Sequence, residues 1–406
     1  MVDISRDPNP SSKSTSRPMV DNPARLLLGP GPSPVDPRIT AAMGEPVISH
    51  VDPVFARTLR ETADLLRQVF GTANEVTFAV SGTGFSGMET ALINVIEPDD
   101  TVIVGISGFF GVKAQEICER MGANTVVATA GFGRPVETED VVEALDANPG
   151  AKAVFVVAAE TSAGLRQPLA DIAEACHARG ALLIADMVTL LGGAEVKADE
   201  WGVDVAYAGS QKCIGTPPGT APITFSPRAV EAIKARRTPV GSWYLSALDI
   251  AAYWTGEIPY HHTTSSPVIV GLKRALELIV AEGIAERALR HERNGAALRA
   301  GFEAMGLEIA SLEGRRLGML TPVGIPDGVA DAEFRAELLE RFNTEIGGGL
   351  GDWAGKVWRI GLMGYGSDPK NVYHVLNAFE VLLAERGVQI RPGAAAAAAS
   401  AVITAG

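Results

Sequence analysis

Residues 206–220 read AYAGSQKCIGTPPGT, a strand-like apolar run that ends at a small polar turn bearing Lys212. Two prolines and a glycine at positions 217–219 then bend the chain before the next apolar run. A lysine at a stiff strand end, with apolar neighbours on both sides, is poorly placed as a solubilising charge. It is well placed as an amine of lowered pKa, the state that a Schiff-base lysine needs. A solvated loop charge is the commoner fate of a lone lysine, so the rest of the chain must decide between the two interpretations.

Apolar, β-branched runs alternate with stretches of helical spacing around this segment. The predicted strands are residues 76–80, 101–104, 125–127, 153–157, 181–185, 203–208 and 221–225. Continuous apolar strands separated by helices predict an α/β fold with a mainly parallel seven-stranded sheet, covered on both faces. Ligands of such sheets bind outside the carboxyl ends of the strands, which is where Lys212 follows its strand.

The chain divides into four predicted segments. They are a flexible N-terminal arm (1–24), a large domain (25–283), a smaller C-terminal α+β domain (284–390) and a loosely ordered tail that contains six consecutive alanines (391–406). In the smaller domain the strand candidates are residues 307–310, 318–323 and 357–363.

Composition limits the class of partner. The net charge of −13 argues against nucleic acid or an anionic membrane. The three cysteines form no CxxC pair, which fits a reduced chain without a disulfide framework. No apolar run has the roughly 20 residues of a membrane span, and we see no secretory signal. We therefore expect a cytoplasmic location.

Residues 81–87, SGTGFSG, join a predicted strand to a predicted helix. The glycines would expose backbone N–H groups at a helix N-terminus, which is an anion site. The same residues satisfy GxGxxG, but a dinucleotide site needs an acidic residue at the end of the next strand. That strand ends VGIS at 104–107, without an acid. A single phosphate is therefore favoured over a dinucleotide, with a purely structural turn as the alternative.

Two charged residues lie in apolar surroundings. Asp186 ends the strand 181–185, where a carboxylate is costly to bury unless it meets a cation such as a protonated pyridine nitrogen. Arg359 shares a strand face with apolar residues and would suit a substrate carboxylate. The alternatives are a loop or helix-capping aspartate and a surface arginine on an edge strand. No HExxH or paired-cysteine pattern indicates a metal. These groups together suit pyridoxal phosphate, because one edge of the sheet would carry a phosphate loop, an acid, a lysine and an arginine for a carboxylate.

Several motifs lie in the order typical of one family. They are LGPGP at 28–32, SGTG at 81–84, GSQK at 209–212 followed by PPGT at 217–220, YHHT at 260–263, and GGGLG at 347–351 leading to RIGL at 359–362. With these motifs, the chain from about Leu26 to about Leu382 resembles the class V (fold type I) aminotransferases. It is most similar to the alanine–glyoxylate and serine–glyoxylate aminotransferases.

The resemblance implies a role for each matching residue. Two residues would be catalytic. Lys212 would bind the cofactor as a Schiff base and move the Cα proton, and Asp186 would contact the pyridinium nitrogen. Arg359, Gly31 and Thr161 would contact the substrate. The cofactor-binding set would be Thr83, Gly84, Phe85, Phe110, Thr161, Asp186, Gln211, Lys212, Tyr260 and Thr263. In the family, the residues that match Tyr260 and Thr263 reach the phosphate of the partner subunit, which implies a homodimer.

The implied function is transamination between a small amino acid (alanine or serine) and a 2-oxo acid (glyoxylate or pyruvate). A pyridoxamine–pyruvate aminotransferase or a pyridoxal-phosphate lyase is an alternative within the cofactor class. A desulfurase needs a mobile nucleophilic cysteine, and Cys213 on a rigid turn is badly placed for that role. Outside the class, a nicotinamide-dependent dehydrogenase rests on GxGxxG alone. A non-enzymatic binding protein leaves Lys212 and Asp186 at one sheet edge unexplained.

Overall fold

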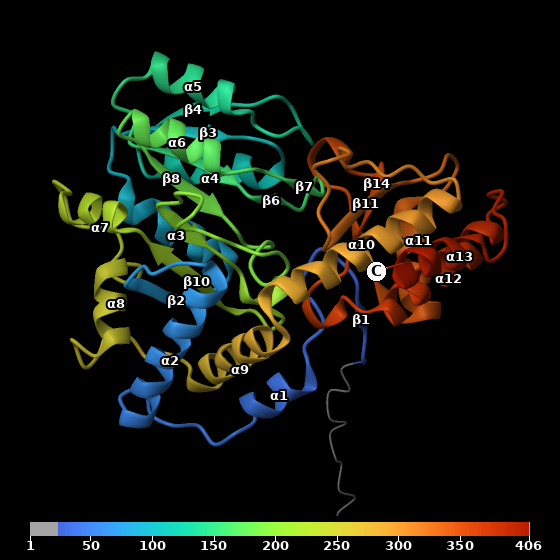
Figure 1. The fold of residues 1–406 in the computed structure, drawn as a ribbon, viewed down its shortest axis with the longest axis horizontal. Coiled ribbons are helices and arrows are strands. Elements are labelled where there is room, and N and C mark those ends of the chain that lie inside the picture. Colours follow the sequence, from blue (N-terminus) through green and yellow to red (C-terminus); the bar gives the residue numbers. More distant parts are fainter. Residues whose placement is uncertain (1–22, 406) are drawn as a thin grey trace, which may run out of the picture.

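The structure, a computed structural model, describes residues 23–405 (Figure 1). The arm predicted for residues 1–24 therefore lies outside the described residues, except for its last two positions. In Figure 1 a larger α/β unit and a smaller α+β unit lie side by side. The helices α9 (Ser266–Glu282) and α10 (Ile284–Ala304) run one after the other from the first unit into the second.

A seven-stranded sheet forms the centre of the larger unit, as predicted. Its strands are β2 (Val76–Gly82), β3 (Thr101–Gly105), β4 (Asn124–Ala128), β5 (Ala153–Val157), β8 (Leu182–Asp186), β9 (Val205–Tyr207) and β10 (Gly219–Phe225). They lie in the order β2-β10-β9-β8-β5-β3-β4. Every neighbouring pair is parallel except the two made by β10, which is antiparallel to both β2 and β9.

Helices cover both faces of this sheet. All residues of β5 and β8 are buried, and because successive side chains point to opposite faces, both faces must be covered. The helices of this unit are α1 (Pro37–Met43), α2 (Pro53–Phe70), α3 (Gly84–Val95), α4 (Phe109–Arg120), α5 (Thr138–Ala147), α6 (Ala170–Ala178), α7 (Pro227–Lys234), α8 (Ala247–Thr255) and α9. A short hairpin, β6 (Ala159–Glu160) with β7 (Leu165–Arg166), follows β5.

The smaller unit contains a second hydrophobic core around an antiparallel sheet. Its strands are β11 (Leu320–Gly324), β14 (Val357–Gly361) and β13 (Gly347–Gly348), and its helices include α10, α11 (Asp331–Phe342) and α12 (Pro369–Glu385). Residues 307–310, a predicted strand, make only a single bridge between Ile309 and Val323. The N-terminal β1 (Leu26–Leu27) pairs with β12 (Thr344–Glu345) and joins this unit, although we expected residues 25–283 to form the large domain.

The C-terminal tail differs from our expectation. We predicted that residues 391–406 are loosely ordered, but residues Ala394–Ala405 form the helix α13, which packs on α10 and α12. Alanine has the highest helix propensity of the ordinary residues, and a spacing of four residues puts the buried Ala395 and Ala399 on one face. The Tyr373 and Ser400 hydroxyls lie 2.9 Å apart and join α13 to α12.

Within residues 23–405, none of the helices has the length and apolar character that a membrane crossing requires.

Substitution of Phe379 on α12 tests how much the second hydrophobic core contributes to the stability of the smaller unit. Its ring is fully buried and lies 5.0 Å from Phe302, 4.9 Å from Phe334 and 5.4 Å from Trp358, measured between ring centroids. We expect Phe379→Ala to lower the free energy of unfolding by about 3–5 kcal/mol, because transfer energy is lost and a cavity remains. The control, Val381→Ala, changes a 41% exposed residue of the same helix. Equal effects of both substitutions in denaturant titrations would contradict this account of the core.

Candidate active site

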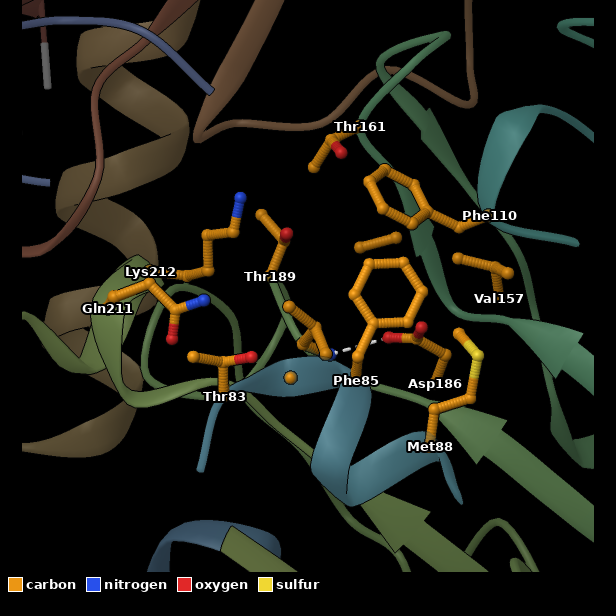
Figure 2. A pocket seen from close by; sticks show the side chains of 13 residues that line it. Thr83, Phe85, Met88, Phe110, Val157, Thr161, Asp186, Thr189, Gln211 and Lys212 are labelled. Atoms are coloured by element: carbon orange, nitrogen blue, oxygen red, sulfur yellow. Dashed lines mark hydrogen bonds between the residues drawn. The ribbon is translucent and has the colours of Figure 1, made fainter. Parts of the chain in front are cut away.

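A cavity of about 230 Å³ opens at the carboxyl ends of the central strands (Figure 2). Its walls come from the starts of α3 and α4, from β5 and β8, and from the turn that carries Lys212. The predicted site residues that line it are Thr83, Gly84, Phe85, Phe110, Thr161, Asp186, Gln211 and Lys212. Met88, Val157, Ala159, Val188 and Thr189 complete the wall. A mostly apolar pocket with a few convergent polar groups is typical of cofactor and small-molecule sites.

Asp186 is the last residue of β8, and its side chain is buried. One carboxylate oxygen, Oδ2, accepts a hydrogen bond from the Tyr207 hydroxyl at 2.6 Å, and Oδ1 accepts one from the backbone N–H of Val188 at 2.8 Å. Burial raises the pKa of Asp186 to about 6, although both hydrogen bonds oppose this shift. Among residues 23–405 the carboxylate therefore has two hydrogen-bond donors but no ion-pair partner.

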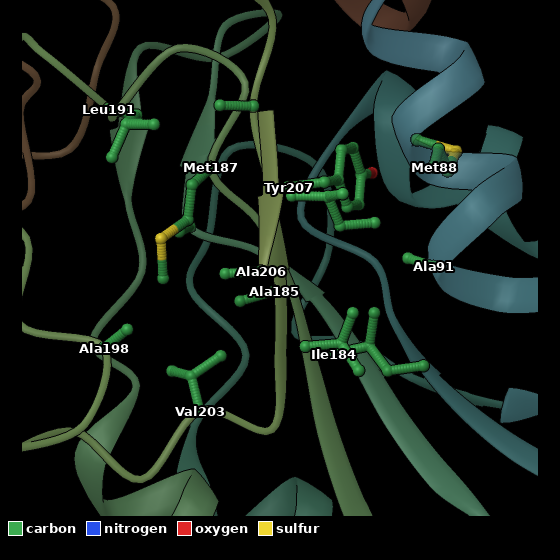
Figure 3. Close-up of a cluster of buried hydrophobic side chains, with 14 of the residues drawn as sticks. Met88, Ala91, Ile184, Ala185, Met187, Leu191, Ala198, Val203, Ala206 and Tyr207 are labelled. Carbon is green, nitrogen blue, oxygen red and sulfur yellow. The ribbon is translucent and has the colours of Figure 1, made fainter. Parts of the chain in front are cut away.

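Tyr207 was missed as a functional candidate in the sequence. It looked like a core residue of its apolar strand, and it is fully buried. Figure 3 shows that it lies on the same side of the strands as Met88 and Ala91 of α3, with Met187 on the other side. The available signal was strand register, because Tyr207 is the direct neighbour of Asp186 in the pairing of β8 with β9.

Lys212 lies in the turn Ser210–Ile214 that follows β9, at a kink where its backbone angles (φ −100°, ψ −124°) are not helical. Its side chain enters the cavity from a different side than Asp186 (Figure 2), and its Nζ donates a hydrogen bond to the carbonyl of Pro30. Burial, and after it the positive charge of Arg359, lowers the pKa of Lys212 to about 8. This agrees with the amine of lowered pKa that the sequence predicted.

Gly31 lies against the lysine side chain. A Cβ atom at this position would come within 2.6 Å of Cδ and 2.7 Å of Nζ of Lys212, and the backbone φ of +108° also favours glycine. Gly31 therefore leaves space for the Lys212 side chain. Its predicted contact with the substrate stays a prediction.

The predicted phosphate loop lies between β2 and α3. Thr83 occupies the N-cap position of α3, but its side chain makes no capping hydrogen bond. The first N–H groups of a helix have no partners within the helix, and together with the helix dipole they attract anions. On the other side of the loop, Gln211 has a buried amide oxygen without a hydrogen-bond partner among the described residues. The hydroxyl and the amide are thus both free for a ligand.

Aromatic rings form one wall of the cavity. The Phe110 ring lies 6.3 Å from that of Phe85 and 5.4 Å from that of Phe109, between centroids. In Figure 2 the Phe110 ring lies between Thr161 and Asp186. Phe85 is 44% exposed, which is unusual for a phenylalanine and leaves its ring accessible beside the cavity.

Arg359, on β14, is buried behind the cavity wall. Its Nε donates to the carbonyl of Gly348 at 2.7 Å, and Nη1 donates to the carbonyl of Thr161 at 3.2 Å. Burial lowers the pKa of Arg359 to about 10. Within residues 23–405 no carboxylate lies within ion-pair distance of it. The guanidinium therefore keeps N–H groups for a further acceptor, although it is not among the residues that line the cavity.

Tyr260 and Thr263 are not brought to the cavity of their own chain. Both are exposed, and the Tyr260 ring lies 5.3 Å from that of His50. Their predicted role concerns the partner subunit, so it stays a prediction.

Known proteins share this fold over almost the whole chain. The family model described as aminotransferase class-V matches residues 40–313, more than half of the chain. The (S)-ureidoglycine–glyoxylate transaminase of Bacillus subtilis (strain 168) is 37% identical in an alignment of 396 residues that covers 93% of this chain and 95% of that protein. The crystal structure of ureidoglycine–glyoxylate aminotransferase from B. subtilis matches with a TM-score of 0.92 and 38% identity, covering 94% of this chain and 99% of that chain.

Two further crystal structures are similar. Alanine–glyoxylate aminotransferase from Nostoc sp. matches with a TM-score of 0.89 and 41% identity, covering 93% of this chain and 100% of that chain. Pyridoxamine–pyruvate aminotransferase from Mesorhizobium loti matches with a TM-score of 0.89 and 29% identity, covering 94% of this chain and 97% of that chain. The predicted fold and family are confirmed by these matches. The chain belongs to the class V aminotransferase family and is, as predicted, an aminotransferase.

Proposed function

We propose that this chain uses pyridoxal phosphate to move the amino group of a small amino acid, alanine or serine, to a 2-oxo acid, glyoxylate or pyruvate. The observation that carries the proposal is that the Lys212 amine and the Asp186 carboxylate reach one cavity beside the Phe110 ring. When bound, pyridoxal phosphate draws electrons away from the Cα of an attached amino acid, which makes the Cα proton removable.

The residues of the cavity fit this cofactor. Asp186 is buried and has hydrogen-bond donors but no ion-pair partner among the described residues, and a protonated ring nitrogen would supply one. The N–H groups at the start of α3 and the Thr83 hydroxyl would hold the phosphate, and the NH₂ group of the Gln211 amide would donate to it from the other side of the loop. The Phe110 ring would pack against the ring of the cofactor.

Lys212 would hold the cofactor and act as the general base. With a pKa of about 8, a substantial fraction of this amine is neutral near pH 8. The neutral amine is the form that attacks a carbonyl and accepts a proton. Its Nζ would therefore take the proton from Cα of the donor and pass it to the cofactor carbon that keeps the amino group. In the second half of the reaction Nζ would carry a proton in the opposite direction, to Cα of the new amino acid.

Arg359 supports an acid as substrate. Only two of the five N–H groups of its guanidinium are used by the carbonyls of Gly348 and Thr161. A buried guanidinium with free donors suits a carboxylate, which it can hold with two hydrogen bonds. Both the amino acid and the 2-oxo acid carry such a carboxylate.

The names of the relatives support the acceptor more strongly than the donor. Glyoxylate is named for the proteins from B. subtilis and Nostoc, and pyruvate for the protein from M. loti. The amino donors in these names are ureidoglycine, alanine and pyridoxamine, all different. Alanine or serine is our proposed donor. Pyridoxamine–pyruvate transamination is the second candidate, because the M. loti structure matches over 94% of this chain.

The cysteines argue against desulfurase chemistry and support a reducing compartment. All three are free thiols and buried. Burial raises the pKa of Cys213, the neighbour of Lys212, to about 12, so its thiol is not a nucleophile at neutral pH. Three unpaired cysteines support the proposed cytoplasmic location.

We propose that the active protein is a homodimer. Besides Tyr260, with 52% exposure, the large side chains of Trp243 and Tyr244 are 63% and 43% exposed. Exposed aromatic side chains are enriched at protein–protein interfaces, and these three lie between residues 243 and 260, so they support an interface in this part of the chain. A second copy of the chain would cover them and receive Tyr260 and Thr263 near its phosphate site.

A panel of donors and acceptors tests the proposed reaction. We expect alanine or serine with glyoxylate or pyruvate to give turnover, and Lys212→Ala to lower kcat at least about 100-fold, because a general base contributes 10²–10⁴-fold. Lys212→Arg is the matched control, since it keeps the positive charge but not the reactive amine. Borohydride trapping with mass spectrometry should locate the cofactor on Lys212 in the wild type only. Normal transamination by Lys212→Ala would refute the proposal.

The pKa of Asp186 predicts how cofactor binding depends on pH. The folded-state pKa, about 6, lies above the ordinary value of 3.8, so protonation of Asp186 favours the folded, cofactor-free protein. This contribution to stability is lost as the pH rises from about 4 to about 6. Around pH 6 the folded protein gains the ionised form of Asp186 that the ring nitrogen needs, so affinity for pyridoxal phosphate should increase as the pH rises through this value.

Asp186→Asn isolates this effect, because every other titrating group stays the same. We expect the difference in dissociation constant between wild type and Asp186→Asn, measured by equilibrium dialysis, to grow between pH 5 and pH 7. Tyr207→Phe should move the midpoint upward, since the Tyr207 hydroxyl lowers the pKa of Asp186. If the difference in dissociation constant stayed the same across this range, ionisation of Asp186 would not contribute to cofactor binding.

Arg359→Ala tests the carboxylate site. We expect KM for the acid substrates to rise about ten- to hundredfold, because a hydrogen bond to a charged group contributes about 1.5–3 kcal/mol, while affinity for pyridoxal phosphate changes less than about threefold. Arg359→Lys retains the charge but not the two-pronged geometry and should recover only part of the loss. Equal losses of substrate and cofactor affinity would mean that Arg359 acts on the structure instead.

A further inference from the structure

Glu160 joins two segments that line the cavity but is not itself part of the wall. It is the last residue of β6 and is fully buried. Its Oε2 accepts a hydrogen bond from the backbone N–H of Phe110 at 3.1 Å. Its Oε1 accepts from the N–H of Ser162 at 2.9 Å and from the Ser162 hydroxyl at 2.6 Å. The Ser162 oxygen in turn accepts from the N–H of Phe109 at 3.0 Å.

This network supplies a helix cap from another part of the chain. The N-cap position of α4 is Gly108, which has no side chain to accept from the first N–H groups of the helix. Glu160 and Ser162 take over this function, and a carboxylate at a helix N-terminus is further favoured by the helix dipole. Gly108 leaves the space that they need, because a Cβ atom there would lie 2.6 Å from Cγ of Glu160.

The same network fixes the relative positions of Phe110, Thr161 and Arg359. The Phe110 ring and the Thr161 side chain both face the cavity, and each belongs to a residue that Glu160 binds or adjoins. The carbonyl of Thr161 accepts a hydrogen bond from Arg359 at 3.2 Å. Movement of the 160–162 segment would therefore displace Thr161 and one contact of Arg359, and would release the start of α4 with Phe110.

We propose that Glu160 is a positioning residue. It holds the Phe110 ring where the ring can pack against the cofactor, and it fixes the positions of Thr161 and Arg359 relative to that ring. This inference rests on the proposed function. Glu160 needs both of its oxygens as acceptors, one for each segment. An amide offers one acceptor oxygen only, so Glu160→Gln must place an NH₂ group against a backbone N–H.

The test compares two buried carboxylates that accept backbone N–H groups. Glu97 follows α3 at the end remote from the cavity, and it accepts from the N–H groups of Arg237 at 3.1 Å and Thr238 at 2.9 Å. Glu97→Gln therefore matches the chemical change of Glu160→Gln at a distant position. We expect both variants to melt at a lower temperature than the wild type.

Only Glu160→Gln should weaken binding of pyridoxal phosphate to the cofactor-free protein, by about tenfold or more in equilibrium dialysis. It should also change the visible circular dichroism of the bound cofactor, which reports the surroundings of its ring, and raise KM for glyoxylate. Cofactor affinity and dichroism equal to those of Glu97→Gln would overturn the inference. Failure of the wild type itself to bind pyridoxal phosphate would instead overturn the proposed function.

Ser162→Ala keeps the test decisive if Glu160→Gln does not fold. It removes the hydroxyl that serves Glu160 and Phe109 but leaves the bond between Glu160 and the N–H of Phe110. We expect a smaller loss of cofactor affinity, about two- to fivefold, with the same change in circular dichroism. A Ser162→Ala protein that matches the wild type in both measurements would count against the proposal.

Discussion

The burial of charge at the carboxyl edge of the central sheet is the constraint on which this site depends. Burial moves the pKa of Asp186 up to about 6 and those of Lys212 and Arg359 down to about 8 and 10, so each group is shifted towards its neutral form. None of the three forms a close ion pair with another described residue. A cofactor with a ring cation and a carbonyl would meet Asp186 and Lys212, and the carboxylate of a substrate would meet Arg359. Binding would thus offset the cost of burying these charges.

Such a site requires a rigid surrounding, and the two hydrophobic cores provide it. Asp186 cannot move towards solvent because β8 is buried along its whole length between β5 and β9. Lys212 is confined by Gly31 and Pro30, which reach it from the segment whose β1 strand pairs with β12 of the smaller unit. The larger unit therefore fixes the acid, and contacts to the smaller unit help to fix the amine.

The sequence predicted the sheet well, because strands covered on both faces are continuous apolar runs that interrupt helical patterns. It also singled out Asp186 and Lys212, since a single charge at the end of such a run is conspicuous, and the structure places both at one cavity. Their roles stay predictions. Tyr207 and Glu160 were not identified, because their partners are 21 and 50 residues away and only strand register and helix position bring them together. The alanine tail was misjudged because its helix is stabilised by packing on α10, and sequence composition does not show packing.

The relatives with this fold carry three different donors in their names, but each name contains a 2-oxo acid as acceptor. Glyoxylate, pyruvate and amino acids share a carboxylate, and a guanidinium such as that of Arg359 can hold it in both halves of a transamination. Pyridoxamine has no carboxylate, so its amine must be presented by contacts to its ring instead. Arg359 therefore separates the two candidate functions: it would serve donor and acceptor alike with alanine or serine, but the acceptor alone with pyridoxamine. The donor would then be selected by the remaining wall of the cavity, to which Phe85 and Thr161 contribute.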